Sequence, residues 1–327
     1  MKLNWFIAVA LFLCLPGLQL SSQNVPQVDI TNGLVKAKLY LPDAKNGYYQ
    51  GARFDWSGVI PELEYAGHSY FDQWFPTYDP KIHDAILGPV EEFFEIGYSQ
   101  AKVGEEFLRI GIGGIKKPEE ERHNRFGSYE ISNPGKWDVK TSSNQVVFTH
   151  TINDVAGHSY VYTKTVRLTE GKPELVLDHT LKNTGKQAIK TVTYNHNFFV
   201  IDRQPISPDV VIRFPYDITG TWGREDGPAV VDGKNIKFTR TLATNESISM
   251  SDVSGHNNLA QNFDIRIENT KTGAGVRIIG DKPIQRMLFW SSPTTACPEP
   301  YIDIDVPPGG EFTWKYVYEF YTLPSSN

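Results

Sequence analysis

The stretch "YVYTKTVRLTEGKPELVLDHTLKNTGKQAIKTVTYNHNFFVI", residues 160–201, decides the fold class. Apolar and β-branched residues alternate with polar ones in 160–168, 174–181 and 189–201, which is the period of two that is typical of half-buried β-strands. The short segments "TEGKP" and "KNTGK" between them are compact turn signals. The stretch therefore predicts three consecutive antiparallel strands, a β-meander.

The same pattern continues outside this stretch. It predicts a strand at 34–42, a hairpin at 263–280 around the turn "TKTGAG", and a final strand at 312–321, "FTWKYVYEFY". No window holds a helical period for more than about two turns, and no linker or internal repeat is present. The chain is therefore predicted to form one large, mostly antiparallel all-β domain over residues 23–327.

Composition limits the classes of partner. Hydrophobic residues make up 40% and charged residues 21% of the 327 residues, which is ordinary for a globular chain that buries a large core. Aromatic residues are abundant at 13%, which suits β-sheets and also surfaces that stack on sugar rings. The net charge of −6 and the lack of any basic block argue against a nucleic-acid partner.

The N-terminal segment "MKLNWFIAVALFLCLPGLQLSSQ" predicts export. A lysine precedes an apolar run over 5–15 and then small and polar residues, so we expect a signal peptide at 1–22 and a periplasmic or extracellular protein. The run is short for a membrane span, so no membrane association is expected after cleavage. Cys14 lacks the small preceding residue of a lipid-modified cysteine. Cleavage would leave Cys297 as the only cysteine, which excludes an internal disulfide.

His196 is the first candidate for chemistry. It lies in "YNHNFF" and shares one face of its strand with Tyr194 and Phe198. Aromatic neighbours lower the pKa of an imidazole by desolvation, which keeps the ring able to exchange a proton near neutral pH. The alternative is a buried histidine satisfied by the neighbouring backbone, and that is the interpretation we give to His179, which faces leucines.

Glu299 is the second candidate. It lies between two prolines in "CPEPY", and prolines stiffen the backbone so that the carboxylate is held in a defined direction. Trp290 and Tyr301 lie close to it in the sequence, and ring-stacking residues beside a fixed carboxylate suit a carbohydrate site. The alternative is an ordinary acidic residue of a surface loop.

These segments together resemble a known family. "YNHNFF" resembles the Asn-His-x-Tyr-Phe signature of the aldose 1-epimerases, or galactose mutarotases, and "CPEPYIDIDVPPGGEFTWKYVYEF" is similar to the closing segment of that family. "NGYYQGARFDWSG", residues 46–58, resembles the N-terminal Gly-Ala strand of the same superfamily. The resemblance spans residues 28–323, and its motifs occur in the order that the family shows.

The resemblance implies a fold and an activity. The fold would be the galactose-mutarotase-like β-supersandwich of large antiparallel sheets, with a monosaccharide or oligosaccharide bound on a concave side. The activity would be a cofactor- and metal-independent interconversion of anomers, with His196 as general acid on the ring oxygen and Glu299 as general base on the anomeric hydroxyl. Folding would have to carry these two groups to opposite flanks of one sugar-sized cavity.

The sequence also departs from the family. The N-terminal sugar-binding histidine and arginine are best matched by His83 and Arg53, although their flanking residues differ and His83 could be a solvated loop histidine. The usual Asp-His pair before the last hairpin is missing in its usual form, and Asp252 and His256 are its nearest equivalents. The candidate substrate-binding residues are therefore Arg53, His83, Asn195, Trp290, Tyr301 and His256, with Asn195 expected to orient its neighbours.

Two other classes remain open. A non-catalytic carbohydrate-binding protein would keep the aromatic surface, and a lyase or hydrolase could use the same scaffold, although lyases of this kind usually bring a helical domain that the sequence lacks. Glu91 and Glu92 would point to opposite sides of an extended strand, so one of them could face a cleft. "GIGG" at 111–114 indicates a tight turn rather than a phosphate-binding loop.

Overall fold

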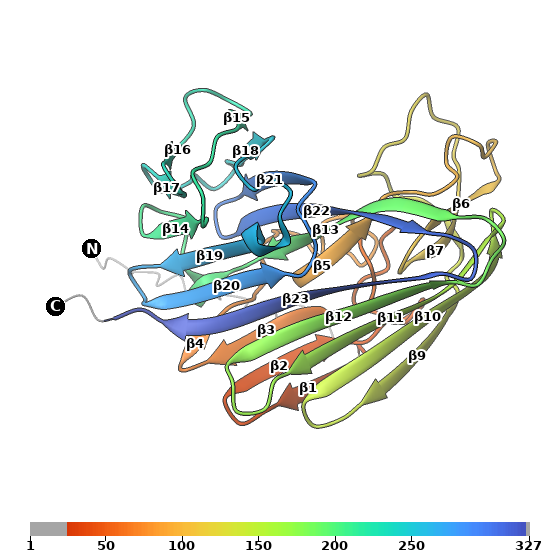
Figure 1. The fold of residues 1–327 in the computed structure, drawn as a ribbon, viewed down its shortest axis with the longest axis horizontal. Helices are drawn as coiled ribbons and strands as arrows, with labels where there is room; N and C mark the ends of the chain where they lie inside the picture. Colours follow the sequence, from red (N-terminus) through yellow and green to blue (C-terminus); the bar gives the residue numbers. More distant parts are fainter. Residues whose placement is uncertain (1–24, 325–327) are drawn as a thin grey trace, which may run out of the picture.

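The computed structural model describes residues 25–324, whose regular secondary structure consists almost entirely of β-strands (Figure 1). The predicted signal peptide at 1–22 and Cys14 lie outside the described residues. Within them, no helix has the length and apolar character needed to cross a membrane.

Twenty-three strands and two short 3₁₀ helices follow one another within residues 25–324. In the N-terminal half they are β1 (Gln27–Thr31), β2 (Val35–Tyr40), β3 (Val59–Tyr65), β4 (His68–Ser69), β5 (Gly88–Phe93), β6 (Glu106–Arg109), β7 (Gly113–Lys116), β8 (Ile131–Asn133), β9 (Lys136–Thr141), β10 (Gln145–Val155) and β11 (His158–Leu168). In the C-terminal half they are β12 (Glu174–Asn183), β13 (Ile189–Phe198), η1 (Ile201–Arg203), β14 (Val210–Arg213), β15 (Thr221–Trp222), β16 (Ala229–Asp232), β17 (Asn235–Phe238), β18 (Ile248–Ser251), η2 (Ala260–Asn262), β19 (Asp264–Asn269), β20 (Ala274–Gly280), β21 (Arg286–Ser291), β22 (Ala296–Val306) and β23 (Glu311–Thr322).

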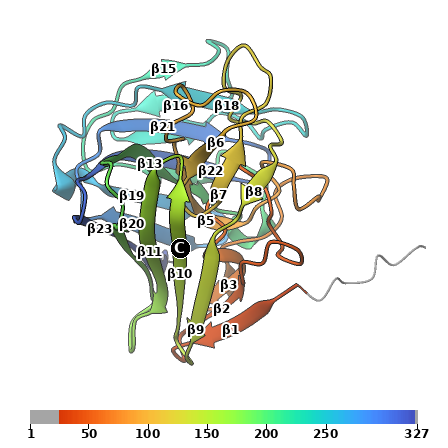
Figure 2. The same ribbon diagram turned by 90° about the vertical axis from the view of Figure 1, so that its right-hand side faces the viewer.

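Two large antiparallel sheets dominate the molecule. The ten-stranded sheet has the order β16-β17-β14-β19-β20-β23-β12-β11-β10-β9, and the six-stranded sheet has the order β15-β18-β21-β22-β13-β5. Figures 1 and 2 show β13, β21 and β22 together above the layer that contains β10 and β11. The sheets meet through aromatic side chains, since Phe93 of β5 contacts both Tyr162 of β11 and Trp314 of β23. This arrangement confirms the predicted all-β fold of large antiparallel sheets.

The predicted meander is correct for two of its three strands. β11 and β12 form an antiparallel hairpin, but β13 pairs with β5 and β22 in the other sheet. The edge of β12 that a meander would give to β13 is occupied by the C-terminal strand β23. The turn "TEGKP" therefore closes a hairpin, whereas "KNTGK" starts a crossing between sheets. The predicted hairpin at 263–280 and the final strand are confirmed as β19–β20 and β23.

A second group of buried aromatic and aliphatic residues lies on the outer side of the six-stranded sheet. It is built from the long segments 41–58 and 70–87, whose buried members include Phe54, Trp56 and Phe75, and it packs on Phe198 of β13. Long segments on a β-scaffold commonly cap a core or build a site. Here they do both, because the same segments that cover the sheet also carry residues of the cavity described next.

Candidate active site

A cavity of about 270 Å³ opens on the outer side of the six-stranded sheet. Strands β13, β18, β21 and β22 supply one side of it, and the loops before β3, before β5 and before β8 supply the other. Its lining residues are Arg53, Trp74, Asp84, Arg125, Phe126, His196, Phe198, Ser249, Leu288, Trp290, Glu299 and Tyr301. Five of the residues singled out from the sequence are among them.

The register of two neighbouring strands brings His196 and Glu299 together. β13 and β22 are antiparallel with Tyr194 opposite Tyr301, so continuing the register by two residues places position 196 opposite position 299. Side chains directly opposite on one face of a sheet are close neighbours. Nε2 of His196 lies 3.3 Å from Oε1 of Glu299. The two groups are therefore adjacent on one wall of the cavity, which corrects the expectation that they occupy opposite flanks.

The environment of His196 disfavours its charged form. Its ring stacks on Phe198 at 3.8 Å between centroids and meets the edges of Phe54 and Trp290. Burial, together with the positive charges of Arg53 and Arg125, holds the pKa of His196 well below its usual value. The imidazole is therefore neutral at physiological pH, and its Nδ1 has no hydrogen-bond partner among the residues that the structure describes.

The environment of Glu299 favours its protonated, neutral form. Burial raises the pKa of Glu299 to about 7, although Arg53 and Arg125 act to lower it. The hydroxyl of Tyr301 lies 3.3 Å from Oε2 of Glu299 and donates to it. Below about pH 7 the pair therefore holds its proton on Glu299 rather than on His196. The family resemblance implies the reverse arrangement, with the proton on the histidine.

A cluster of guanidinium groups underlies the cavity. Arg53 donates through Nε to Oε2 of Glu92 at 2.7 Å and through Nη2 to the Tyr194 hydroxyl at 3.0 Å, and it also pairs with Asp84. Arg125 donates through Nη2 to the same Glu92 oxygen and the same Tyr194 hydroxyl, both at 2.6 Å. Burial alone would raise the pKa of Glu92, but the surrounding guanidinium groups lower it to about 2. Glu92 is thus a fixed anion that orients both arginines.

Four more predicted residues are placed as follows. Trp290 and Tyr301 line the cavity directly, as does Arg53. His83 does not line it, but its Nδ1 lies 3.0 Å from Oδ1 of Asp84, which does. His83 therefore contacts a residue of the lining without lining the cavity itself.

Asn195 and His256 do not reach the cavity. Asn195 points to the other side of β13, because successive residues of a strand face opposite sides, and there it donates to Glu91 at 2.9 Å and accepts from Tyr318 at 3.0 Å. His256 lies in the loop after β18, where its Nδ1 accepts from the backbone of Asn258. The sugar-binding role expected for these two residues therefore has no support from their positions, whereas the orienting role expected of Asn195 agrees with its contacts.

Several lining residues were not identified from the sequence. Trp74 and Asp84 lie in the aromatic, acidic and proline-rich segment 61–90, whose composition was the available signal for a site-building loop. Arg125 and Phe126 lie in a polar loop between β7 and β8 that carries no distinguishing pattern. Only the folded chain brings that loop over Tyr194.

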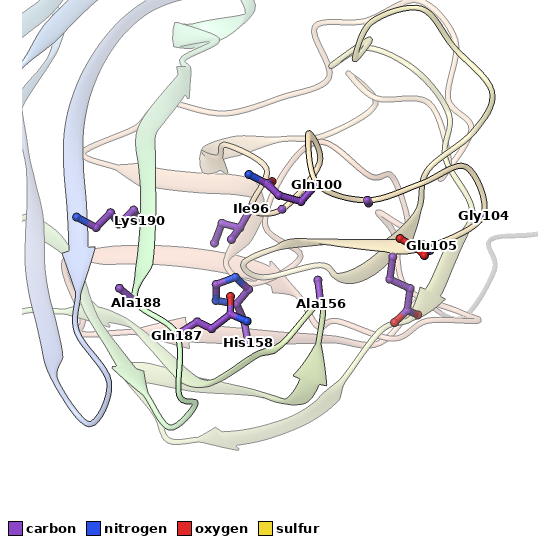
Figure 3. A pocket seen from close by; sticks show the side chains of 12 residues that line it. Ile96, Gln100, Gly104, Glu105, Ala156, His158, Gln187, Ala188 and Lys190 are labelled. Atoms are coloured by element: carbon purple, nitrogen blue, oxygen red, sulfur yellow. The ribbon is translucent and has the colours of Figure 1, made fainter.

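A larger hollow of about 790 Å³ lies elsewhere, beside the turn between β10 and β11 (Figure 3). Its walls include His158, Gln187, Glu105 and Lys190, and they contain none of the residues predicted from the sequence to carry chemistry. Among the described residues of its lining, no imidazole is paired with a carboxylate as His196 is with Glu299. The candidate active site is therefore the cavity of about 270 Å³, although the hollow beside β10 and β11 has the greater volume.

The described residues contain no group of three or more His, Cys, Asp or Glu side chains arranged to hold a metal ion. The cavity instead combines one acid–base pair, two guanidinium groups and a set of aromatic rings. Groups of these kinds can bind a polar ligand and exchange protons with it.

Comparisons with known proteins give the fold. No protein-family model matches the chain, and no curated protein matches it. Among solved structures, a galactose mutarotase-like protein from Clostridium acetobutylicum superposes with a TM-score of 0.54 at 13% identity, covering 91% of this chain and 95% of its own. A galactose mutarotase-like protein from Lactobacillus casei gives 0.52 at 11% identity, with coverages of 90% and 100%. A galactose mutarotase related enzyme from Lactobacillus acidophilus gives 0.52 at 11% identity, with coverages of 92% and 99%. The chain therefore has the galactose-mutarotase-like fold that the family resemblance implied.

Proposed function

We propose that this chain is a sugar epimerase of the aldose 1-epimerase type, which interconverts the anomers of a sugar by opening and closing its ring. The observation that carries the proposal is the contact between the His196 imidazole and the Glu299 carboxyl group, 3.3 Å apart in a cavity lined by aromatic rings. The fold shared with mutarotase-like proteins is consistent with this activity.

The chemistry needs one proton donor and one proton acceptor. Ring opening delivers a proton to the ring oxygen and removes one from the anomeric hydroxyl, and both oxygens are bonded to the same carbon. Two adjacent groups can therefore reach both oxygens at once. Because the proton resides on Glu299 near neutral pH, Glu299 donates to the ring oxygen and Nε2 of His196 accepts from the hydroxyl.

Opening leaves an imidazolium and a carboxylate, and these are the charge states that the family resemblance assigns to the two residues. After the aldehyde carbon rotates, Glu299 accepts the proton of the ring hydroxyl while His196 returns a proton to the carbonyl oxygen. The ring closes on the other face and the pair recovers its starting protonation. Each positioned acid or base contributes on the order of 10²–10⁴-fold, which is enough for a reaction that already proceeds in water.

The cavity suits a single sugar ring. Ligand pockets for drug-sized molecules occupy about 300–1,000 Å³. The cavity of about 270 Å³ is slightly smaller, so it fits one monosaccharide or one terminal unit of an oligosaccharide. Trp74, Trp290 and Tyr301 offer ring faces for its apolar side, and Arg53 and Arg125 offer donors for its hydroxyl groups.

Proton NMR on freshly dissolved α-galactose and α-glucose tests the proposal. We expect the protein that begins after residue 22 to accelerate the approach to anomeric equilibrium, and His196→Ala and Glu299→Gln to abolish the acceleration. His256→Ala is the matched control, because that histidine lies outside the cavity and its loss should leave the rate unchanged. An anomerisation rate in His196→Ala equal to that of the unaltered protein would contradict the proposal.

A non-catalytic carbohydrate-binding protein is the second candidate. Two observations favour it: His196 and Glu299 contact each other, and only 4% of His196 and 5% of Glu299 is exposed, which limits the access of a substrate to either group. A binder of this kind would retain a sugar in equilibrium dialysis without changing the rate of anomerisation, and both variants would bind as well as the unaltered protein. The two candidates therefore differ in one measurement.

We propose in addition that the protein is exported to the periplasm or beyond the cell, on the basis of the apolar run over 5–15. N-terminal sequencing of the mature protein tests this, and we expect it to begin near residue 23. A mature chain that begins at Met1 in the cytoplasm would contradict it.

A further inference from the structure

A second cluster of ionisable side chains lies between the two large sheets, on the side of β5 and β13 that faces away from the cavity. Lys164 of β11, Glu91 of β5 and Asp55 of the loop before β3 are all buried with 0% exposure. The Nζ atom of Lys164 donates to the Glu91 carboxylate and lies 3.7 Å from Oδ2 of Asp55. One amine and two carboxyl groups therefore share a space that solvent does not reach.

The two carboxyl groups are held in different protonation states. Burial alone would raise the pKa of Glu91, but the charge of Lys164 and the hydrogen bond from Nε2 of His179 at 3.0 Å lower it to about 2. Burial raises the pKa of Asp55 to about 6, with Lys164 acting to lower it and Glu91 acting to raise it. Asp55 is therefore the carboxyl group that can hold a proton near neutral pH, and Glu91, which contacts Nζ of Lys164, is the carboxylate that stays ionised.

The Asp55 carboxyl group is also polarised by donors. The backbone N–H of Ser57 donates to Oδ1 at 2.9 Å, while the Ser57 hydroxyl and the Tyr162 hydroxyl donate to Oδ2 at 2.6 and 3.0 Å. Donors aimed at a carbonyl group stabilise the negative charge that develops on oxygen when a nucleophile adds to the carbon.

The surroundings are tightly closed. A Cβ at Gly58 would lie 2.9 Å from Cε of Lys164, and a Cβ at Gly111, in the tight turn predicted from "GIGG", would collide with the Asp55 carboxyl group. The His179 ring stacks on Trp314 at 4.6 Å on the far side of Glu91. Reacting groups that are held together and shielded from water can reach effective concentrations of about 10⁵ M or more.

We propose that Lys164 and Asp55 form an amide bond between Nζ and Cγ, with Glu91 as the general base, so that the folded protein carries an internal covalent cross-link. Glu91 first takes one proton from the Lys164 ammonium group, which leaves a neutral amine. The amine nitrogen adds to Cγ of the protonated Asp55 carboxyl group. The hydroxyl group of Asp55 then leaves with a second amine proton as one water molecule.

The step balances without an oxidant, a reductant or a cofactor. One Nζ–Cγ bond replaces one Cγ–O bond, the positive charge of Lys164 and the negative charge of Glu91 are both lost, and one water molecule is released. Removing two buried charges favours the product, because a sealed ion pair gives up the hydration of both ions. The bond joins the loop that carries Arg53 to the ten-stranded sheet, in a chain whose predicted mature form has one cysteine and no internal disulfide.

Mass spectrometry of the intact, denatured protein tests the proposal. We expect the measured mass to be lower than the sequence mass by one water molecule, and proteolysis to yield a branched peptide in which Lys164 is joined to Asp55. Lys164→Arg, Asp55→Ala and Glu91→Gln should each restore the full mass. Lys182→Arg is the matched control, because this exposed lysine of β12 lies outside the cluster and its variant should still lose one water molecule.

The unaltered protein decides the question even if the variants fail to fold. A full sequence mass in the folded, active protein would overturn the proposal and leave the cluster as a buried ion pair. A water loss that maps to other residues, or a link from Lys164 to Glu91, would also overturn it. Anomerisation is measured separately, so failure of the cross-link is distinguishable from failure of the epimerase proposal.

Discussion

Strands β5 and β13 present two faces that differ in what surrounds their carboxylates. On the outer face Glu92 meets Arg53 and Arg125, which come from loops, and a cavity lies above them. On the inner face Glu91 meets Lys164 and His179, which come from β11 and β12 of the opposing sheet, and no exposed surface remains. Loops that reach over a sheet leave room for a ligand, whereas two packed sheets close the space between them. The same pair of strands therefore supports a binding site on one side and a sealed cluster on the other.

Glu91→Gln should give the largest effect on stability. In this variant the proposed cross-link does not form and the buried Lys164 ammonium group has no anionic partner, and an unpaired buried charge of this kind costs about 3–5 kcal/mol. Glu92→Gln should cost less, because one of its arginine partners, Arg125, has 31% of its side chain exposed to water. Urea unfolding of both variants measures the difference. A greater loss of unfolding free energy in Glu92→Gln would contradict the view that the inner face is the more tightly closed of the two.

Glu299→Gln should give the largest effect on activity. The amide keeps the shape of the side chain but cannot exchange a proton, so we expect the anomerisation rate to fall about 10²–10⁴-fold, which is roughly 3–5 kcal/mol of barrier. The folded structure should persist, since the variant introduces no charge into a buried position. Circular dichroism checks the fold and polarimetry checks the rate. An unchanged rate in Glu299→Gln would mean that Glu299, and with it the cavity on the outer face, does not take part in catalysis.

The strand period accounts for what the sequence predicted correctly. The alternation along β13 placed His196 beside Tyr194 and Phe198, and the alternation along β5 sent Glu91 and Glu92 to opposite sides, as the structure confirms. Period two is a local property, so local sequence is enough to show it.

Strand partners are not a local property. The contact between His196 and Glu299 depends on the pairing of β13 with β22, and the lost meander depends on β23 reaching β12. The turns "TEGKP" and "KNTGK" have similar sequences, but the first connects two strands of one sheet and the second connects strands of different sheets. The reason is that the free edge of β12 pairs with the distant strand β23 and not with β13. Arg125 could not be identified for the same reason, since only tertiary packing carries its loop to the cavity.

The pH dependence of stability sharpens the view of the outer face. The pKa of Glu299 is raised from 4.5 to about 7 in the folded protein, so the folded state binds the proton more tightly than the unfolded state. Its contribution is fully present below about pH 4.5 and is lost as the pH rises through 7, at up to about 1.4 kcal/mol per pH unit. Unfolding of the unaltered protein and of Glu299→Gln from pH 4 to 8 should show the difference shrink with rising pH. A constant difference would place the carboxyl group in contact with solvent.

The pH dependence of activity should have a single limb. Glu299 must be protonated to donate to the ring oxygen, so the rate should fall about tenfold per pH unit above pH 7. The pKa of His196 is depressed by burial and by the nearby arginines, so the imidazole stays neutral and the rate should be level between pH 5 and 6. Polarimetry from pH 5 to 9 measures the profile, and a rate that rises steadily up to pH 9 would contradict the role of protonated Glu299 as the acid.

The smallest effects separate two residues that face opposite ways from the six-stranded sheet. Trp290→Ala removes one aromatic wall of the cavity, and the loss of an aromatic contact worth about 0.5–1.5 kcal/mol should raise KM about 2–10-fold. Asn195→Ala should leave KM unchanged, because Asn195 faces the inner cluster, but it removes a donor to Glu91 and should cost about 1–3 kcal/mol of stability. Initial rates at varied sugar concentration and urea unfolding of both variants test this division. An increase in KM for Asn195→Ala that matches the increase for Trp290→Ala would mean that the inner cluster shapes the cavity through β13, and that the two faces do not act independently.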